Sequence, residues 1–277
     1  MISGKTTLIA HLGYPTDAFK APMIYNPWFE HARIDAVVVP MGVRGDDYEA
    51  FLPQLFHLTN IRGALVTMPH KVTTVGLLDQ VTPTVLIAGS CNAILRRADG
   101  SLLGDMFDGE GFVRGVRRKG RTIAGARALV VGSGGVGSAI AASLAAAGIG
   151  ELGLFDVDAG VAAALENRLA RHYPQLRIVT GSNDPGGCDI VVNATPLGMR
   201  RDDPLPLDTR RLAAGAFVGE VVMTQETTPF LRAALERGCE VQVGTDMLFE
   251  QIPAYLEFFG FGSTTPDVLR AVAKIRY

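Results

Sequence analysis

The chain has 277 residues, of which 26 are Lys or Arg and 28 are Asp or Glu, and its formal net charge is -2. This length suits two domains, and the near-neutral charge argues against nucleic acid or a membrane surface as a partner. Because the sequence shows no uncharged apolar stretch of about 18 residues and no signal-peptide pattern, we expect a cytoplasmic protein.

The first third of the chain alternates short apolar runs with helical patterns, which is typical of an α/β domain. Apolar residues at helical spacing predict helices over residues 46–58 and 72–79. Residues 93–103 predict a hairpin, with turn-forming residues at 98–100. Short runs rich in apolar and β-branched side chains predict buried strands at residues 7–10, 36–39 and 63–67.

From about residue 122 onward, strands alternate regularly with helices, which predicts a parallel sheet covered on both faces. The apolar strand at residues 128–131 leads into a glycine-rich turn and then into an alanine-rich helix that ends near Gly148. Helices are also expected at residues 247–259 and 266–275. Further strands are expected at residues 152–155, 177–180, 190–192, 217–222 and 241–243.

These elements predict an α/β fold with two domains. Residues 1–108 are expected to form a substrate-binding and catalytic domain, and residues 109–246 a doubly wound Rossmann domain that binds NAD(P). The C-terminal helices, in residues 247–277, are expected to pack back on the first domain. A segment rich in glycine and arginine, residues 108–121, is expected to join the two domains.

The glycine-rich turn has the G-x-G-x-x-G pattern of dinucleotide-binding proteins, and its context makes the match specific. It follows a strand and opens a helix, and Asp156 stands at the end of the next strand. Such glycines let the backbone turn sharply and approach the pyrophosphate, which then faces the N–H groups of the helix. The expected cofactor-binding residues of this motif are Gly132, Ser133, Gly134, Gly135, Val136, Gly137 and Asp156.

Asp156 bears on the choice of cofactor. A carboxylate at this strand end can accept hydrogen bonds from the ribose hydroxyls of NAD, and it would repel the 2′-phosphate of NADP. Val157 and Asp158 follow it, with no arginine to bind a phosphate. NAD is therefore the expected cofactor, although Arg200 and Arg201 leave NADP as the alternative because a neighbouring loop could bring them near the ribose.

Neither a disulfide framework nor a metal site is expected. The three cysteines are far apart in the sequence and form no C-x-x-C pair, which suits a reducing compartment. The five histidines lack the H-x-x-x-H and H-E-x-x-H spacings, so surface or structural roles are expected for most of them.

Beyond the glycine motif, the sequence resembles the shikimate dehydrogenase family from Gly13 to Gly260. Several short motifs occur in the family's order, and together they make the match specific. They comprise residues 13–15 with Pro22 and Asn26, residues 67–71 (T-x-P-x-K), residues 89–92, residues 104–111, residues 193–199 and residues 244–251.

The resemblance implies an N-terminal substrate domain, a Rossmann domain and a cleft between them, with Lys71 and Asp108 as the catalytic pair. An alcohol that loses a hydride must also lose its hydroxyl proton, and a lysine with a partnered aspartate can transfer that proton. Without the family context, Lys71 would be read as an ordinary surface lysine and Asp108 as a helix cap. The resemblance also implies substrate contacts from Thr67, Asn92 and Gln251 and cofactor contacts from Asn193, Thr195 and Gly244.

The sequence departs from the family at the places that bind the substrate carboxylate. The two serines of the family's S-x-S-P motif are Phe19 and Ala21 here, and the asparagine two residues before Thr67 is Leu65. Further polar residues of the family are also replaced, by Met106, Phe107 and Met223. Phe19 and Ala21 are thus the substrate-facing positions at which this chain is expected to differ from the family in substrate binding. A site that loses hydrogen-bonding groups binds a polar substrate more weakly.

Three hypotheses about function remain open. The leading one is a shikimate-dehydrogenase-like oxidoreductase whose small, hydroxylated substrate is not shikimate or is bound differently. The second is an ordinary shikimate or quinate dehydrogenase in which Lys20 or Arg200 binds the carboxylate. The third is a regulatory protein that binds NAD without chemistry, which the presence of both Lys71 and Asp108 disfavours. The only partner expected is a small-molecule substrate, and the sequence leaves a homodimer open.

Overall fold

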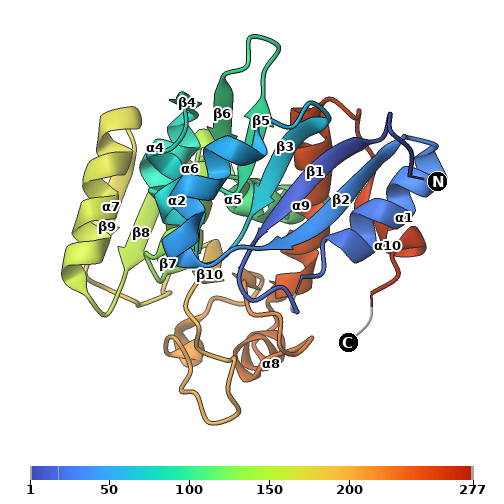
Figure 1. Ribbon diagram of the computed structural model, residues 1–277. Coiled ribbons are helices and arrows are strands. Elements are labelled where there is room, and N and C mark those ends of the chain that lie inside the picture. The colour runs from blue at the N-terminus through green and yellow to red at the C-terminus, as the bar shows by residue number, and fades with distance from the viewer. Residues whose placement is uncertain (1, 18, 276–277) are drawn as a thin grey trace. The chain divides into compact units, whose positions relative to one another are not determined.

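The computed structural model describes residues 2–17 and 19–275 (Figure 1). The chain divides into two compact units, each with its own six-stranded sheet. The first unit holds the described residues up to Phe107 and from Ile252 onward, and the second holds Asp108–Gln251. The expected α/β class, with a substrate domain and a Rossmann domain, is confirmed.

The first sheet has the strand order β2-β1-β3-β5-β6-β4. Strands β1 and β3 lie inside the sheet and pair with each other in parallel. Strand β5 runs antiparallel to its neighbours β3 and β6. The strands are β1 (Thr7–Gly13), β2 (Ala36–Gly42), β3 (Ile61–Val66), β4 (Gln80–Val81), β5 (Ala93–Arg96) and β6 (Leu102–Asp105). The helices of this part of the chain are α1 (Pro22–Ala32), α2 (Gly45–Leu55), α3 (Lys71–Val75), α4 (Pro83–Ala88) and α10 (Pro266–Val272).

The second sheet is entirely parallel, in the order β12-β11-β10-β7-β8-β9. Its strands are β7 (Arg127–Val131), β8 (Glu151–Phe155), β9 (Arg177–Thr180), β10 (Ile190–Asn193), β11 (Phe217–Glu220) and β12 (Glu240–Gln242). The helices are α5 (Asp108–Arg118), α6 (Gly135–Ala146), α7 (Ala159–His172) and α8 (Pro229–Glu236), with a short 3-10 turn, η1 (Thr209–Arg211). The order of the strands reverses between β7 and β10, and such a switch point is where doubly wound sheets bind ligands.

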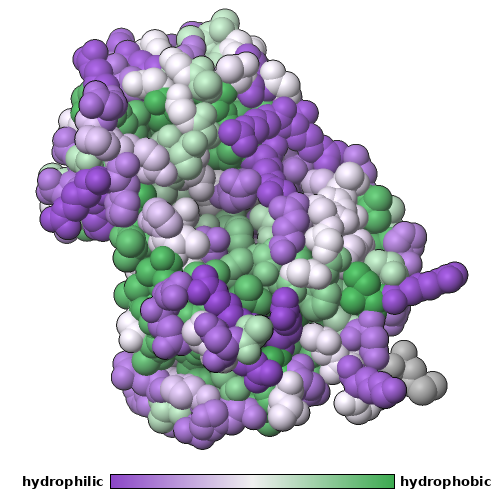
Figure 2. Space-filling view, turned by 90° about the horizontal axis from the view of Figure 1, so that it is seen from above, coloured by the Kyte–Doolittle hydropathy of each residue, from purple (hydrophilic) through white to green (hydrophobic). Residues whose placement is uncertain are grey.

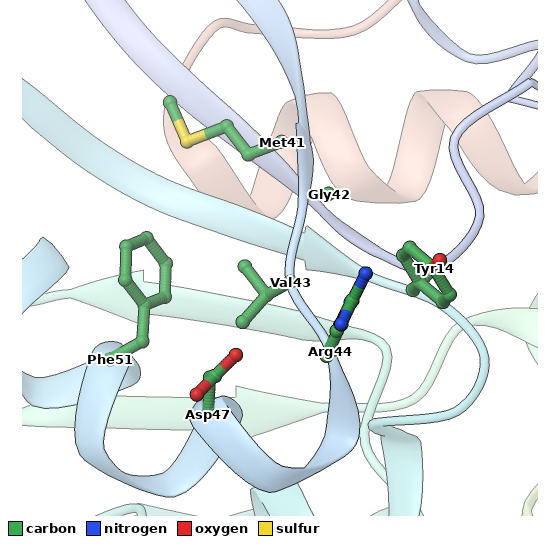
Figure 3. A pocket seen from close by; sticks show the side chains of 7 residues that line it. All are labelled: Tyr14, Met41, Gly42, Val43, Arg44, Asp47 and Phe51. Atoms are coloured by element: carbon green, nitrogen blue, oxygen red, sulfur yellow. The ribbon is translucent and has the colours of Figure 1, made fainter.

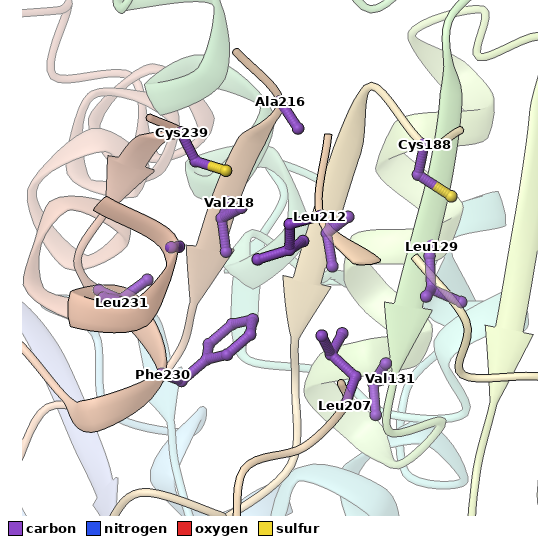
Figure 4. Packing of buried hydrophobic residues seen from close by; sticks show 12 residues of the cluster. Leu129, Val131, Cys188, Leu207, Leu212, Ala216, Val218, Phe230, Leu231 and Cys239 are labelled. Carbon is purple, nitrogen blue, oxygen red and sulfur yellow. The ribbon is translucent and has the colours of Figure 1, made fainter. Parts of the chain in front are cut away.

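One hydrophobic cluster covers the β7, β10 and β11 part of the second sheet. Phe230 and Leu231 of α8 pack there against Val131 and Val218, as Figure 4 shows. Each of these four side chains is at most 2 % exposed. Burying a side chain of this size stabilises the fold by roughly 1.5–3 kcal/mol, so this core holds the carboxyl ends of the three strands in place.

The segment expected to join the domains forms the helix α5, and the division between the two units falls at its first residue, Asp108. Its glycines allow close packing rather than flexibility, because a side chain at Gly109, Gly111 or Gly115 would collide with neighbouring atoms. For Gly109 the nearest atom is the carbonyl oxygen of Ala139 in α6. The arginines of the segment lie on the outer side, where Arg114 pairs with Glu110 at 2.7 Å.

Several other elements differ in length from the sequence expectation. β1 continues to Gly13, three residues beyond the predicted strand, because its parallel pairing with both neighbours extends through Leu12. α3 covers only Lys71–Val75 and ends at Gly76. The helix expected from residue 247 begins at Gly244 and is α9 (Gly244–Phe259).

The surface mixes hydrophilic and hydrophobic residues, as Figure 2 shows for one face. Some large hydrophobic side chains are exposed, among them Val157, Val72 and Met68, and exposed apolar residues are ordinary for globular proteins. Among the described residues, no helix combines the length and apolarity that crossing a bilayer requires.

Candidate functional site

The glycine-rich loop between β7 and α6 is tightly packed at two glycines and open at a third. Gly132 has a φ of 98°, a region that favours glycine, and it lies tightly against Ala194 after β10. A side chain at Gly137 would strike the carbonyl oxygen of Gly132. Gly134, in contrast, borders open space. The loop therefore packs closely where helix and strand meet and stays open where phosphate would approach the first N–H groups of α6.

Asp156 braces this loop from the end of β8. Its Oδ2 accepts a hydrogen bond from the Ser133 N–H at 2.7 Å, and its Oδ1 accepts one from the Asp158 N–H at 3.0 Å. A carboxylate oxygen has two lone-pair directions, so both oxygens retain capacity for ribose hydroxyls. Val157, beside it, is 96 % exposed. Residues 156–158 thus carry two carboxylates and no cation.

The loop after β10 is held rigid by Asn193. Its Oδ1 accepts hydrogen bonds from the Thr195 N–H at 3.1 Å and the Thr195 hydroxyl at 2.6 Å, and its Nδ2 donates to the Leu197 carbonyl at 3.0 Å. The side chain of Thr195 also lies against Gly132. Asn193 and Thr195, two predicted cofactor residues, therefore stand beside the glycine-rich loop at the switch point.

Glu220 was not predicted as a functional residue, yet it is fully buried at the end of β11. Its Oε2 accepts a hydrogen bond from the Thr228 hydroxyl at 2.8 Å, and its Oε1 has no partner among the described residues. Burial raises the pKa of Glu220 to about 7, against the opposing effects of Thr228 and Asn193. A charged residue in an otherwise apolar strand was the sequence signal that could have found it.

The titration of Glu220 predicts how stability changes with pH. Between the ordinary carboxyl pKa and about 7, the folded protein holds a proton that the unfolded chain has lost, so stability falls as pH rises through this window. Glu220→Gln keeps the neutral shape and should remove that fall. We expect the two proteins to have similar urea midpoints at about pH 5. At about pH 8 we expect the variant to have the higher midpoint. A constant difference across this range would contradict the assignment.

In the first unit, Thr67 directly follows the carboxyl end of β3 and lies beside the carboxyl end of β1. The Thr67 N–H donates to the Leu12 carbonyl at 2.9 Å, which joins the two strand ends. Lys71 begins α3, one turn after Thr67, and its carbonyl accepts the Cys91 N–H at 2.8 Å. The Asn92 carbonyl in turn accepts the Val66 N–H at 2.8 Å.

Asn92 also fixes the chain immediately before Asp108. Its Oδ1 accepts a hydrogen bond from the Phe107 N–H at 2.9 Å, and its side chain is 1 % exposed. Asp108 is the next residue, the first of α5, and it is buried. The main chain that carries Asp108 is therefore tied to the same short segment, residues 91–92, that bonds the Lys71 carbonyl.

The three places where polar anchors are lost are apolar in the structure as well. Leu65 is 5 % exposed on β3. The ring of Phe19 stacks on the imidazole of His11, with 4.1 Å between ring centroids, and it also reaches the space beside Gly13. Ala21 precedes the first residue of α1 and forms no side-chain cap there. These side chains offer no hydrogen bond to a carboxylate.

The remaining predicted residues, Gln251 and Gly244, belong to the second unit. Gly244 opens α9 and packs so closely against the Val222 carbonyl that a side chain would not fit. Gln251 lies next to Gly111 of α5, is 8 % exposed, and its Oε1 has no partner among the described residues. An unpaired buried amide oxygen suits a ligand-binding role.

A cavity of about 550 Å³ lies elsewhere in the first unit, beside β2 and α2. Among the residues that line it, the guanidinium carbon of Arg44 lies 5.9 Å from the centroid of the Tyr14 ring. Asp47 and Phe51 project from α2 (Figure 3). None of the predicted site residues lines this cavity. Among the described residues, no group of three or more His, Cys, Asp and Glu side chains could hold a metal ion.

Comparison with known proteins places these observations in context. Residues 12–94 match the family model for the shikimate dehydrogenase substrate binding domain, and residues 113–160 match that of the ThiF family. A curated relative, shikimate dehydrogenase (NADP(+)) of Rhodospirillum rubrum, is 36% identical over 278 residues, covering 98% of both chains.

Solved structures show the same fold at lower identity. Shikimate 5-dehydrogenase of Listeria monocytogenes, in complex with shikimate and NAD, has a TM-score of 0.91 at 24% identity, covering 98% of this chain and 97% of its own. The ligand-free 5-ketofructose reductase of Gluconobacter sp. strain CHM43 has a TM-score of 0.89 at 23% identity, covering 98% of each chain.

Proposed function

The chain belongs to the shikimate dehydrogenase family and is an NAD(P)-dependent oxidoreductase that acts on CH–OH groups; we propose that its own substrate is a small, uncharged alcohol or ketone other than shikimate. The observation that carries this proposal is a contrast within one site. Thr67, Lys71 and Asn92 are retained at the strand ends, whereas the anchor positions Phe19 and Leu65 are apolar.

The fold does not choose the substrate. The two solved neighbours are named for a cyclic hydroxy acid and for a keto sugar, and one fold regularly supports different substrates through different site residues. The substrate of this chain must therefore be argued from its own side chains. The absence of hydrogen-bonding side chains at the anchor positions argues against a carboxylate on the substrate. The retained Lys71 and Asp108 support transfer of a hydroxyl proton.

In the proposed mechanism, the glycine-rich loop at residues 132–137 would hold NAD(P), which would supply the hydride acceptor for oxidation of the hydroxyl carbon. The Lys71 amine takes the hydroxyl proton during oxidation and returns it during reduction. Asp108 has the proposed role of orienting the Lys71 amine. Thr67 and Asn92 position the substrate, and Asn92 also holds the Phe107 N–H, so the segment that carries Asp108 stays fixed.

We further propose that NAD is preferred over NADP, although the Rhodospirillum rubrum relative is named for NADP. The support is Asp156, which braces the glycine-rich loop through Ser133 and would repel a 2′-phosphate. For Asp156→Ser with Val157→Arg, the NAD-to-NADP ratio of kcat/KM should fall at least about tenfold, since a hydrogen bond to a charged group contributes about 1.5–3 kcal/mol. Val157→Arg alone is the matched control, and wild-type preference for NADP would contradict the proposal.

The proposed function is tested by steady-state turnover with NAD and with NADP over a panel of neutral cyclic polyols, ketones and hydroxy acids. We expect efficient turnover of a neutral member. An ordinary shikimate or quinate dehydrogenase is the second candidate, favoured by the names of the relatives, and efficient turnover of shikimate or quinate would establish it. Binding of NAD without turnover of any neutral compound in the panel would contradict the proposed substrate class.

A further inference from the structure

His11 is a buried histidine at the substrate end of β1 to which no role has been given. It is 8 % exposed, and the parallel register places it opposite Leu65 of β3. Paired residues of neighbouring parallel strands point to the same face of a sheet. His11 therefore shares a face with the position at which the family's asparagine is lost, and Phe19, at the place of a lost serine, stacks on its ring.

The imidazole lacks a hydrogen bond that its burial demands. Nδ1 of His11 has no partner among the described residues. Buried polar atoms in native proteins are nearly always paired, so an unpaired one calls for an explanation. By comparison, the Nε2–H of the buried His70 donates to the Val43 carbonyl at 2.8 Å, as in an ordinary structural histidine.

The ring is also uncharged under ordinary conditions. Burial and the positive charge of Lys71 lower the pKa of His11 to about 4. A neutral imidazole presents one N–H donor and one lone-pair acceptor. It can bond a hydroxyl or carbonyl oxygen, but it brings no charge to neutralise a carboxylate.

We propose that His11 is a specificity-determining residue that hydrogen-bonds, through Nδ1, an uncharged hydroxyl or carbonyl oxygen of the substrate. The substrate is accordingly a neutral polyol or ketose. Nδ1 is buried in this structure, so the proposed bond requires neighbouring atoms to move when the substrate binds. The bond lies in the plane of the ring and leaves the face stacked on Phe19 undisturbed. This inference rests on the proposed function, because it names the substrate class of the same site.

The test replaces His11 with leucine and with asparagine. Leucine removes both ring nitrogens, whereas the Asn amide nitrogen can stand near the position of Nδ1. On the best neutral substrate we expect His11→Leu to lower kcat/KM about tenfold, mainly through KM, since one neutral hydrogen bond is lost. His11→Asn should recover much of that loss. Unfolding midpoints and NAD affinity report whether each variant is folded.

A second measurement does not depend on turnover. The imidazole resonances of His11, assigned from the His11→Asn spectrum, are followed by NMR while inositol, fructose and shikimate are added to the wild-type protein. We expect inositol or fructose to shift them and shikimate to leave them in place. A shift without turnover would defeat the proposed function and keep the inference. Unchanged kinetics in folded His11→Leu, or no shift with either neutral probe, would overturn the inference and leave the oxidoreductase function intact.

Discussion

Lys71→Ala is expected to lower kcat by about 10²–10⁴-fold, on whichever substrate the enzyme turns over, because a positioned acid–base group contributes about that factor. Cofactor affinity should stay unchanged, since Lys71 belongs to α3 of the first unit and the glycine-rich loop to the second. The measurement is steady-state kinetics with a separate determination of the NAD dissociation constant. Lys5→Ala, which removes an exposed lysine of the same unit, is the matched control.

The kinetic pattern distinguishes proton transfer from binding. If Lys71 only held the substrate, Lys71→Ala would raise KM and leave kcat nearly unchanged. Asp108→Asn, which keeps the shape of the side chain and removes its charge, should change both kcat and its pH profile. A variant pair that altered KM alone would assign both residues to substrate binding.

Shikimate is expected to be a poor substrate, with kcat/KM lower by about two orders of magnitude or more than a carboxylate-anchoring site would give. Each hydrogen bond to a charged group contributes roughly 1.5–3 kcal/mol, and two or more such bonds are missing at Phe19, Ala21 and Leu65. The measurement compares shikimate with the best neutral substrate in the same assay.

Restoring the anchors sharpens this second test. The triple variant Phe19→Ser, Ala21→Ser, Leu65→Asn should gain activity on shikimate and lose it on the neutral substrate. Its NAD affinity and unfolding midpoint serve as controls, because Phe19 and Leu65 also pack in the first unit. Shikimate turnover by the wild-type enzyme at the efficiency of an ordinary metabolic enzyme would show that other residues anchor the carboxylate.

Local signals in the sequence predicted the strand, glycine-rich turn and helix of β7 and α6 well. The apolar strand, the glycines at residues 132–137 and Asp156 are close in the sequence, and each has a direct backbone or hydrogen-bonding role. At α5 the glycines did not reveal the helix, although the division between the units falls at its first residue. Gly109 and Gly115 are there because α5 packs tightly against other elements, and such long-range packing leaves no local pattern.

The missed residues illustrate a second limit. His11 directly follows a predicted strand, and its role depends on which residues lie beside it in the sheet, namely Leu65 in register and Phe19 above the ring. Register between strands about 50 residues apart is set by the whole sheet rather than by local sequence. Glu220 could have been predicted more easily from the sequence, since a carboxylate within an apolar strand is itself unusual.

The central claim is that this chain transfers a hydride between a nicotinamide dinucleotide and a neutral hydroxyl carbon. It is tested most directly by incubating the enzyme with NADH deuterated at its transferable hydrogen and with the ketone form of the best neutral substrate. We predict that the alcohol product carries one deuterium at the former carbonyl carbon, seen by mass spectrometry. Unlabelled product, or label transfer only to the keto form of shikimate, would contradict the account.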